Sequence, residues 1–157
     1  MRRTDREITD FAQIREIIEK TEILHLALFD EEYPYIVPMH YGCEFEGEKT
    51  VLYMHGAKQG HKLDLLRKNS AACVEIENDV TQTSGGEIPC QYGAIYSSVI
   101  ARGRVEIPED SAEKIHGLTI LMKHQTGRDF EITETMAETV AVLKFTADCV
   151  TAKARKK

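Results

Sequence analysis

The chain contains no tryptophan, and its four cysteines are too widely spaced to form a motif. They stand at Cys43, Cys73, Cys90 and Cys149, without the close pairs that zinc ribbons and thiol redox motifs require. We therefore expect free thiols in a reducing compartment. The six histidines form no HExxH motif and have no carboxylate beside them at metal-ligand spacing, so we expect no bound metal.

Long apolar runs are also missing. No stretch approaches the roughly 18 consecutive apolar residues of a membrane span, and the start MRRTDREITDF lacks the apolar core of a signal peptide, so we expect a cytoplasmic protein. No repeat or Pro/Gly/Ser-rich linker marks a boundary, which predicts a single domain over residues 1–157. The formal charge of -6 argues against general nucleic-acid binding.

The apolar patterns that are present predict a mainly β fold with peripheral helices. We expect strands near residues 23–29, 33–41, 50–54, 71–77, 94–107 and 140–145, with a further strand segment after the last. We expect helices near residues 11–18, 60–69, 108–124 and 134–138, the first capped by Asp10. Because most strands are joined by hairpin-length turns, these elements favour an antiparallel barrel.

The segment YPYIVPMHY, residues 33–41, has strong β character but contains Pro34 and Pro38. Proline cannot donate to a strand ladder, so this strand lies at an edge or turns its backbone toward something other than a strand. A planar ligand bound by the amide and carbonyl groups of Val37 and Met39 is one such partner. An edge strand protected by its prolines is the alternative.

The segment YMHGAKQGHKL, residues 53–63, is the most specific feature of the chain. A strand is expected to end at His55, and a helix to begin near Gly60 with Lys62 in its first turn. Free amides at a helix start together with a lysine form an anion site, and phosphate is its usual occupant. Residues 57–69 carry a local charge of +3: Lys58, Lys62, Arg67 and Lys68 against Asp64. A glycine turn with solvated charges is the alternative.

The segment YSSVIARGRV, residues 96–105, predicts a strand with two adjacent hydroxyl groups. Successive strand side chains point to opposite faces, so either Ser97 or Ser98 points inward. A glycine inside a strand, here Gly103, is typical of a bulge or of a close approach by another group.

In these segments the chain resembles the nitroimidazole-resistance (Nim-type) branch of the pyridoxamine 5′-phosphate oxidase-like flavoproteins. The stretches that carry the resemblance are MRRTDREITDF, LALFDEEYPYIVPMHYG, YMHGAKQGHKLDLLRKN and YSSVIARGRVEI. They span nearly the whole chain in the family's order. The resemblance implies an FMN-binding split β-barrel, antiparallel and Greek-key-like, which forms a homodimer with two cofactor sites at the interface.

The resemblance also implies contacts to FMN. Residues 35–40 would lie along the isoalloxazine ring, and residues 54–57 and 60–62 would hold the ribityl chain and the phosphate, with Lys62 as the phosphate-binding lysine. The helix end at residues 123–126 would reach the partner's flavin. The candidate cofactor-binding residues are Val37, Pro38, Met39, His40, Met54, His55, Ala57, Gly60, His61, Lys62, Ser98, His124 and Gln125.

The function that the resemblance implies is an FMN-dependent, nitroreductase-like reductase, with NAD(P)H or another reductant as electron donor. His55 is the candidate catalytic residue, as a proton donor or substrate-binding group, because imidazole titrates near physiological pH. A structural His55 that only bonds ribityl hydroxyls is the alternative. The chain has no tryptophan, and Gly60-His61-Lys62 stands where vitamin-pathway oxidases carry Ser-Arg-Lys, which disfavours pyridoxamine phosphate oxidation.

Three further functional classes stay open at this point. One is a flavin-storing or flavin-sensing protein without turnover. Another is a haem-binding relative on the same barrel, with His40, His55 or His124 as the axial ligand. The third is an interaction module that binds no coloured cofactor.

Overall fold

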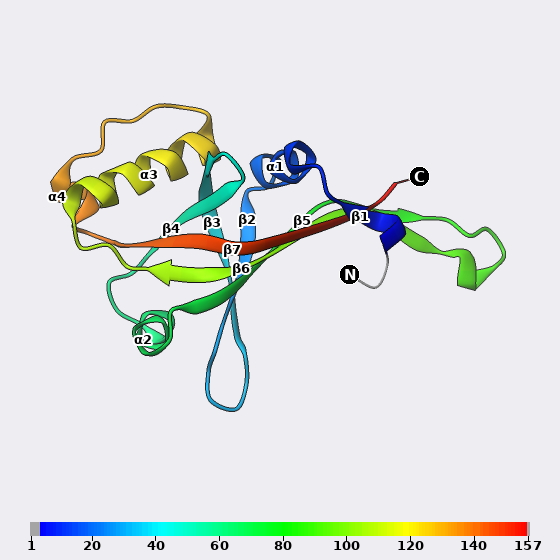
Figure 1. Cartoon of the computed structure of the whole chain (residues 1–157), viewed down its shortest axis with the longest axis horizontal. Helices are drawn as coiled ribbons and strands as arrows, with labels where there is room; N and C mark the ends of the chain where they lie inside the picture. Colours follow the sequence, from blue (N-terminus) through cyan, green and yellow to red (C-terminus); the bar gives the residue numbers. More distant parts are fainter. Residues whose placement is uncertain (1–3, 157) are drawn as a thin grey trace.

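Six long antiparallel strands form the centre of the molecule in a computed structural model that describes residues 4–156 (Figure 1). They are β2 (Ile23–Leu28), β3 (Tyr35–Glu46), β4 (Lys49–Gly56), β5 (Ala71–Thr83), β6 (Gly93–Glu106) and β7 (Ala141–Arg155), and a short β1 (Glu7–Ile8) pairs with β7. The sheet runs β7-β4-β3-β2-β5-β6, and pairing of β6 with β7 closes it into a barrel. The first three residues of the N-terminal motif and Lys157 lie outside the described residues.

The topology confirms the Greek-key expectation. β2, β3 and β4 follow one another as hairpins, and β5 then returns to pair with β2. The spatial order β5-β2-β3-β4 is that of a Greek key. Helix α2 (His61–Lys68) lies in the connection that carries the chain from β4 to β5.

The barrel is split between β3 and β4. Tyr41 and Met54 form the last pair between these two strands. Beyond this pair, residues 35–40 of β3 pair only with β2, while His55 and Gly56 of β4 pair only with β7. Pro38 lies in the half of β3 that has a free edge, which confirms the prediction that the proline-containing strand is an edge there.

Apolar side chains fill the barrel, and helix α1 (Phe11–Lys20) closes one side of it. Ile14, Ile17 and Ile18 of α1 are buried against the barrel core. The hydroxyl of Tyr41 is buried and donates to the carbonyl of Ile18 at 2.6 Å, so its polar group is satisfied. The predicted N-cap is present, since the Asp10 carboxylate accepts from the amide of Ala12 at 3.0 Å.

Helix α3 (Ser111–Thr126) packs across β3 and β4, followed by the short α4 (Glu134–Ala137). Asp110 caps the start of α3, and Gly127 ends it in the left-handed conformation. A second, smaller apolar cluster lies under these helices: Val51, Tyr53, Leu118, Ala137 and Val142. None of the helices within residues 4–156 is long and apolar enough to span a membrane.

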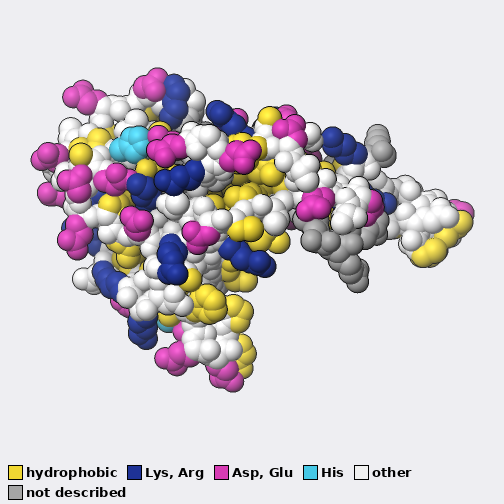
Figure 2. Space-filling view, in the orientation of Figure 1, with side chains coloured by type: hydrophobic (Ala, Val, Ile, Leu, Met, Phe, Trp, Pro, Cys, Tyr) yellow, Lys and Arg dark blue, Asp and Glu magenta, His cyan; other side chains and the backbone are white. Residues whose placement is uncertain are grey.

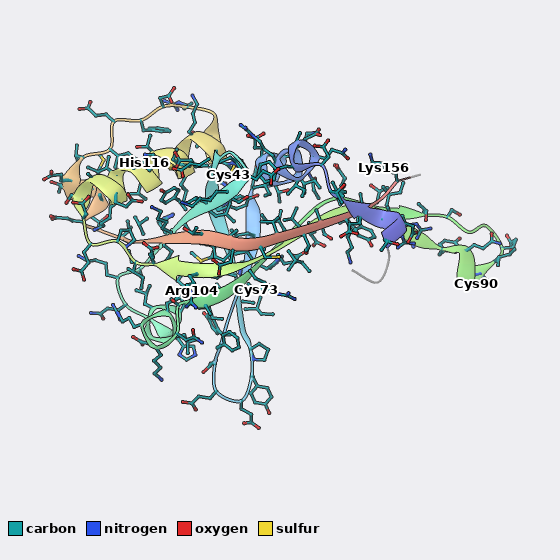
Figure 3. The ribbon with its side chains drawn as sticks, viewed as in Figure 1. Cys43, Cys73, Cys90, Arg104, His116 and Lys156 are labelled. Atoms are coloured by element: carbon teal, nitrogen blue, oxygen red, sulfur yellow. The ribbon has the colours of Figure 1, made fainter. Side chains whose placement is uncertain are left out.

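β5 and β6 continue past the barrel as a two-stranded ribbon, which we call the arm (residues 78–95, Figure 1). The prediction that the strand ends near residue 77 was therefore wrong. Residues 78–83 lack an apolar alternation, and they stay extended because they pair with residues 93–97 of β6. Cys90 lies near the tip of the arm, far from Cys43 and Cys73 (Figure 3).

Candidate functional site

The split between β3 and β4 brings together three segments that the sequence singled out. They are the free-edge half of β3, the end of β4 with Ala57, and the start of α2. We call this group of residues 35–40, 55–57 and 60–62 the cradle. Val37, Pro38, Met39 and His40 come from the first segment, and Gly60, His61 and Lys62 come from the last.

Lys62 crosses the split. Its Nζ lies 3.6 Å from Sδ of Met39 on β3, and a Cβ at Gly56 on β4 would stand only 2.8 Å from the same Nζ. The side chain is half-buried, and burial lowers its pKa. No carboxylate within residues 4–156 forms an ion pair with it. A partly buried ammonium without a counter-charge is unfavourable by itself and favours an anion beside it.

The start of α2 adds backbone donors to the same place. Gly60 is the N-cap residue with φ of 135°, a conformation that favours glycine, and no side chain caps this helix end. The first amides of the helix are therefore open to an external acceptor. Lys62 stands in that first turn, so the cation and the backbone donors coincide, as an anion site requires.

The side chain of His61 is already engaged. Its Nε2 lies 2.6 Å from Oδ2 of Asp30, and its ring meets that of Tyr35 edge-on at 5.2 Å. These contacts fasten the start of α2 to the β2–β3 connection. His61 thus offers the cradle its backbone amide rather than its ring.

His55 differs from the other histidines of the chain. Within residues 4–156 the other five each lie within hydrogen-bond distance of a protein group, whereas His55 has no such partner. Its ring is partly exposed at the end of β4. Burial of the rest of the ring lowers its pKa, and the nearby Lys62 and His40 lower it further. A neutral imidazole that can accept or donate a hydrogen bond is therefore available at this edge of the cradle.

An apolar pocket of about 300 Å³ opens beside His55, beneath α3 and α4. Its walls are Leu118, Met122, Phe130, Glu131, Ile132, Met136 and Val140. We call this space the α3–α4 pocket. Phe130 and Met136 are partly exposed, and the guanidinium carbon of Arg128 lies 5.0 Å from the centre of the Phe130 ring.

His124 and Gln125 connect the end of α3 by hydrogen bonds to β3 and to the segment before β2. Gln125 Oε1 lies 2.7 Å from Nδ1 of His40, and Gln125 Nε2 donates to the carbonyls of Tyr41 and Glu22 at 2.8 and 2.9 Å. His124 Nε2 donates to the carbonyl of Thr21 at 2.8 Å. Both side chains thus hold α3 against β3 and the segment before β2, and only Gln125 connects to the cradle, through His40.

Two other sequence-predicted residues lie away from the cradle. The side chain of Met54 is fully buried in the barrel core, so it leaves only its backbone for a ligand. Ser98 pairs with Lys153, near the end of β7, whereas Gly56 pairs with Ala141 at the beginning of that strand. The register therefore places Ser98 far from the cradle of its own chain. Ser98 is buried, which confirms that one of the two serines points inward.

Five residues that sequence reasoning missed form a polar network between α3 and the barrel. Glu113 of α3 accepts from the Tyr53 hydroxyl at 3.1 Å and from Lys144 Nζ at 2.7 Å. His116 of α3, labelled in Figure 3, has its Nε2 3.0 Å from Oε2 of Glu44. We call these five residues the clamp. Lys144 lowers the pKa of Glu113, and Glu113 raises that of Lys144, as expected for a satisfied pair.

The chain is similar to known proteins in sequence and in fold. A sequence profile described as pyridoxamine 5′-phosphate oxidase matches residues 10–154. The chain is similar to the structure of a candidate 5-nitroimidazole antibiotic resistance protein from Bacteroides thetaiotaomicron, with 31% identity, a TM-score of 0.81, and coverage of 94% of this chain and 86% of that one. A search of curated proteins finds no match.

Two more distant structures share the fold. The flavocytochrome Anf3 from Azotobacter vinelandii has 19% identity and a TM-score of 0.80, covering 100% of this chain and 72% of its own. The FAD and heme binding protein from Mycobacterium smegmatis has 16% identity and a TM-score of 0.81, covering 97% of this chain and 74% of its own. At this level of identity both indicate the architecture alone.

Proposed function

The chain belongs to the pyridoxamine 5′-phosphate oxidase family, and from this we propose that it is a flavin-dependent reductase that binds FMN at the cradle. The observation that carries the proposal is the ammonium of Lys62, which has no carboxylate partner within residues 4–156 and stands at the start of α2, where no side chain of the described residues caps the helix. A phosphate group supplies the negative charge that this ammonium lacks.

The residues of the cradle fit FMN in two respects. The open amides of α2 and Lys62 suit the phosphate, while the free edge at residues 35–40 of β3 offers backbone donors and acceptors to the edge of a planar ring. FMN would supply a two-electron carrier, and the protein would supply orientation and electrostatics. The Bacteroides relative is described by resistance to a 5-nitroimidazole antibiotic, which supports a nitro compound as the substrate that we propose.

The reaction that we propose is a two-electron reduction of a nitro group to a nitroso group. A nicotinamide donor is oxidised as it gives up a hydride, a solvent proton is taken up, and the nitro group loses one oxygen as water. We propose that His55 acts on the substrate, because its ring has no hydrogen-bond partner within residues 4–156 and its lowered pKa favours the neutral imidazole. A neutral imidazole can donate its N–H to the oxygen that gains a proton.

We further propose that the protein works as a homodimer in which a second copy covers the open side of the cradle. Phe29, Tyr33 and Ile36 are 67%, 72% and 59% exposed, and Ile36 adjoins Val37 of the cradle. Figure 2 shows hydrophobic side chains on the β2–β3 hairpin, and residues of this hairpin, β5 and β6 together line a cavity of about 620 Å³. Large apolar side chains that are exposed side by side are typical of a protein–protein interface.

The test is the visible spectrum of the purified protein during one turnover. With added FMN we expect a bound flavin that NAD(P)H bleaches under anaerobic conditions and that a 5-nitroimidazole reoxidises. Bound flavin that no nitro compound reoxidises would instead indicate a storing or sensing protein. A colourless protein that takes up no FMN would overturn the proposal.

A Soret band would favour the haem alternative over the flavin. Two of its three axial candidates have partners in the structure, because His40 lies against Gln125 and His124 donates to a backbone carbonyl. His55 alone is free to ligate, which makes His55→Ala the variant that would remove such a band.

A further inference from the structure

The α3–α4 pocket and the cradle meet at His55. This residue is the last but one of β4, between Met54 of the barrel core and Gly56, against which Lys62 lies. Its ring also lines the α3–α4 pocket, whose other walls come from α3, α4 and their connections. One imidazole therefore borders both spaces, and a molecule held in the pocket would lie next to anything held in the cradle.

The chemistry of the walls defines what the pocket can hold. Six of its lining residues are apolar: Leu118, Met122, Phe130, Ile132, Met136 and Val140. His55 is the one lining imidazole, and Glu131 is the one lining carboxylate. Apolar walls cannot replace the water molecules that an ion loses on binding, so they disfavour a charged ligand of either sign. A neutral molecule with one hydrogen-bonding group avoids this cost and can use His55 for that group.

The size of the pocket narrows the choice further. About 300 Å³ is at the small end of the range of ligand pockets, which suits one substituted ring and not a fused tricyclic ring system. These features favour a small molecule over a protein segment as its occupant.

We infer that the α3–α4 pocket is the substrate site, that it selects neutral molecules built on a single ring, and that Met136 and Phe130 at its partly exposed wall set this selectivity. The ring lies among the apolar side chains, and a polar substituent points to His55. This inference deepens the proposed reductase function and rests on it.

The experiment uses nitrobenzene and 4-nitrobenzoate as probes, which share one ring and differ by a carboxylate. Binding to the FMN-loaded protein is measured by saturation-transfer NMR and calorimetry. We expect nitrobenzene to bind at least 10-fold more tightly than 4-nitrobenzoate. In Met136→Glu we expect nitrobenzene affinity to fall at least 10-fold and its KM to rise with kcat retained, because a carboxylate at a 56%-exposed position lines the apolar wall without displacing core atoms.

The matched control is Ile88→Glu, a similar change at a 47%-exposed position on the arm, away from the pocket. It should leave nitrobenzene affinity unchanged, and both variants should bind FMN within two-fold of the parent. If Met136→Glu lowers the melting temperature, Phe130→Ser replaces it. The inference is overturned if these variants keep full nitrobenzene affinity, if nitrobenzene displaces FMN, or if Met136→Glu changes only the oligomeric state.

Failure of the proposed function gives a different result. In that case FMN does not bind, while nitrobenzene binding is measured on the same protein without FMN and still reports on the pocket. Tight FMN binding together with absent or unselective ring binding would overturn the pocket inference alone.

Discussion

Two regions of this small barrel use the same residue types in opposite ways. In the clamp, Lys144 donates to Glu113 at 2.7 Å, and this contact raises the pKa of Lys144. In the cradle, the Lys62 ammonium has the sulfur of Met39, at 3.6 Å, as its one hydrogen-bond partner within residues 4–156, and burial lowers the pKa of Lys62. The histidines follow the same division, because His116 lies against Glu44 while His55 has no partner within residues 4–156.

The contrast separates polar groups that hold the fold from groups that are available to a ligand. A polar group with a protein partner has replaced its lost water contacts, so removing the partner costs stability. A half-buried polar group without a protein partner loses water contacts on folding and does not stabilise the fold. Such a group is best explained as a binding site for a ligand. Changes in the clamp should therefore alter stability, and changes in the cradle should alter affinity.

The largest effect is expected where α3 lies on the barrel. In Gly42→Ala the new Cβ would stand 2.5 Å from the backbone N and Cα of Leu121, and a helix backbone cannot rotate away as a side chain can. We expect the free energy of unfolding to fall by about 3 kcal/mol, measured by urea denaturation. The FMN affinity of the protein that stays folded should be unchanged, and a variant as stable as the parent would contradict the tight packing described here.

Lys62→Ala should have the next largest effect, on affinity alone. Loss of a charge-assisted contact to phosphate should weaken FMN binding about 10- to 100-fold, measured by quenching of flavin fluorescence. Stability without FMN should not fall, because Lys62 has no ion-pair partner among residues 4–156 to lose. The matched control is Lys144→Ala, for which we expect the reverse pattern. Equal FMN affinity in Lys62→Ala would refute the cradle as the phosphate site.

A smaller effect is expected from Glu113→Gln in the clamp. The pair with Lys144 is partly exposed, so we expect a loss of about 1 kcal/mol at pH 7. Because the folded-state pKa of Glu113 is lowered, its stabilisation is present above its ordinary pKa and disappears as the pH falls through the lowered value. Urea denaturation should therefore show the difference between Glu113→Gln and the parent shrinking as the pH falls below the ordinary pKa of a glutamate carboxyl, and a constant difference would contradict this assignment.

The smallest effect concerns the charge of His55. Proton NMR should give its imidazole a titration midpoint below the ordinary value of about 6.5. Lys62→Met should raise this midpoint, because it removes a cation that disfavours the protonated ring, whereas Lys144→Met should not. Since the folded-state pKa is lowered, His55 should also destabilise the fold as the pH falls below its ordinary value. A midpoint insensitive to Lys62 would separate His55 from the cradle.

Sequence patterns predicted much of the cradle because each of its three segments is a short continuous stretch of the chain. Pro38 indicated a strand edge, and the glycine-rich segment before Lys62 indicated a strand end, a turn and a helix start, all of which the structure contains. The resemblance predicted the split barrel, which the family match and the Bacteroides structure confirm. The contacts of these residues with FMN stay predictions.

The clamp and the α3–α4 pocket could not be predicted from the sequence in the same way. Glu113 and Lys144 stand 31 residues apart, and His116 and Glu44 stand 72 apart, so no motif connects them. His124 and Gln125 resembled a flavin-contacting segment, but their hydrogen bonds to Thr21, Glu22 and Tyr41 depend on how α3 lies on the barrel. The i,i+4 spacing of Leu118 and Met122 was a weak signal of a shared helix face.

The position of β7 has a consequence for how the protein folds. β7 pairs with β1, β4 and β6, and it follows all of them in the chain. During synthesis, β2 to β6 can form hairpins, but the barrel cannot close until β7 has left the ribosome. Strand edges on β4 and β6 stay unpaired until β7 joins them, which leaves the nascent chain prone to aggregation up to that point.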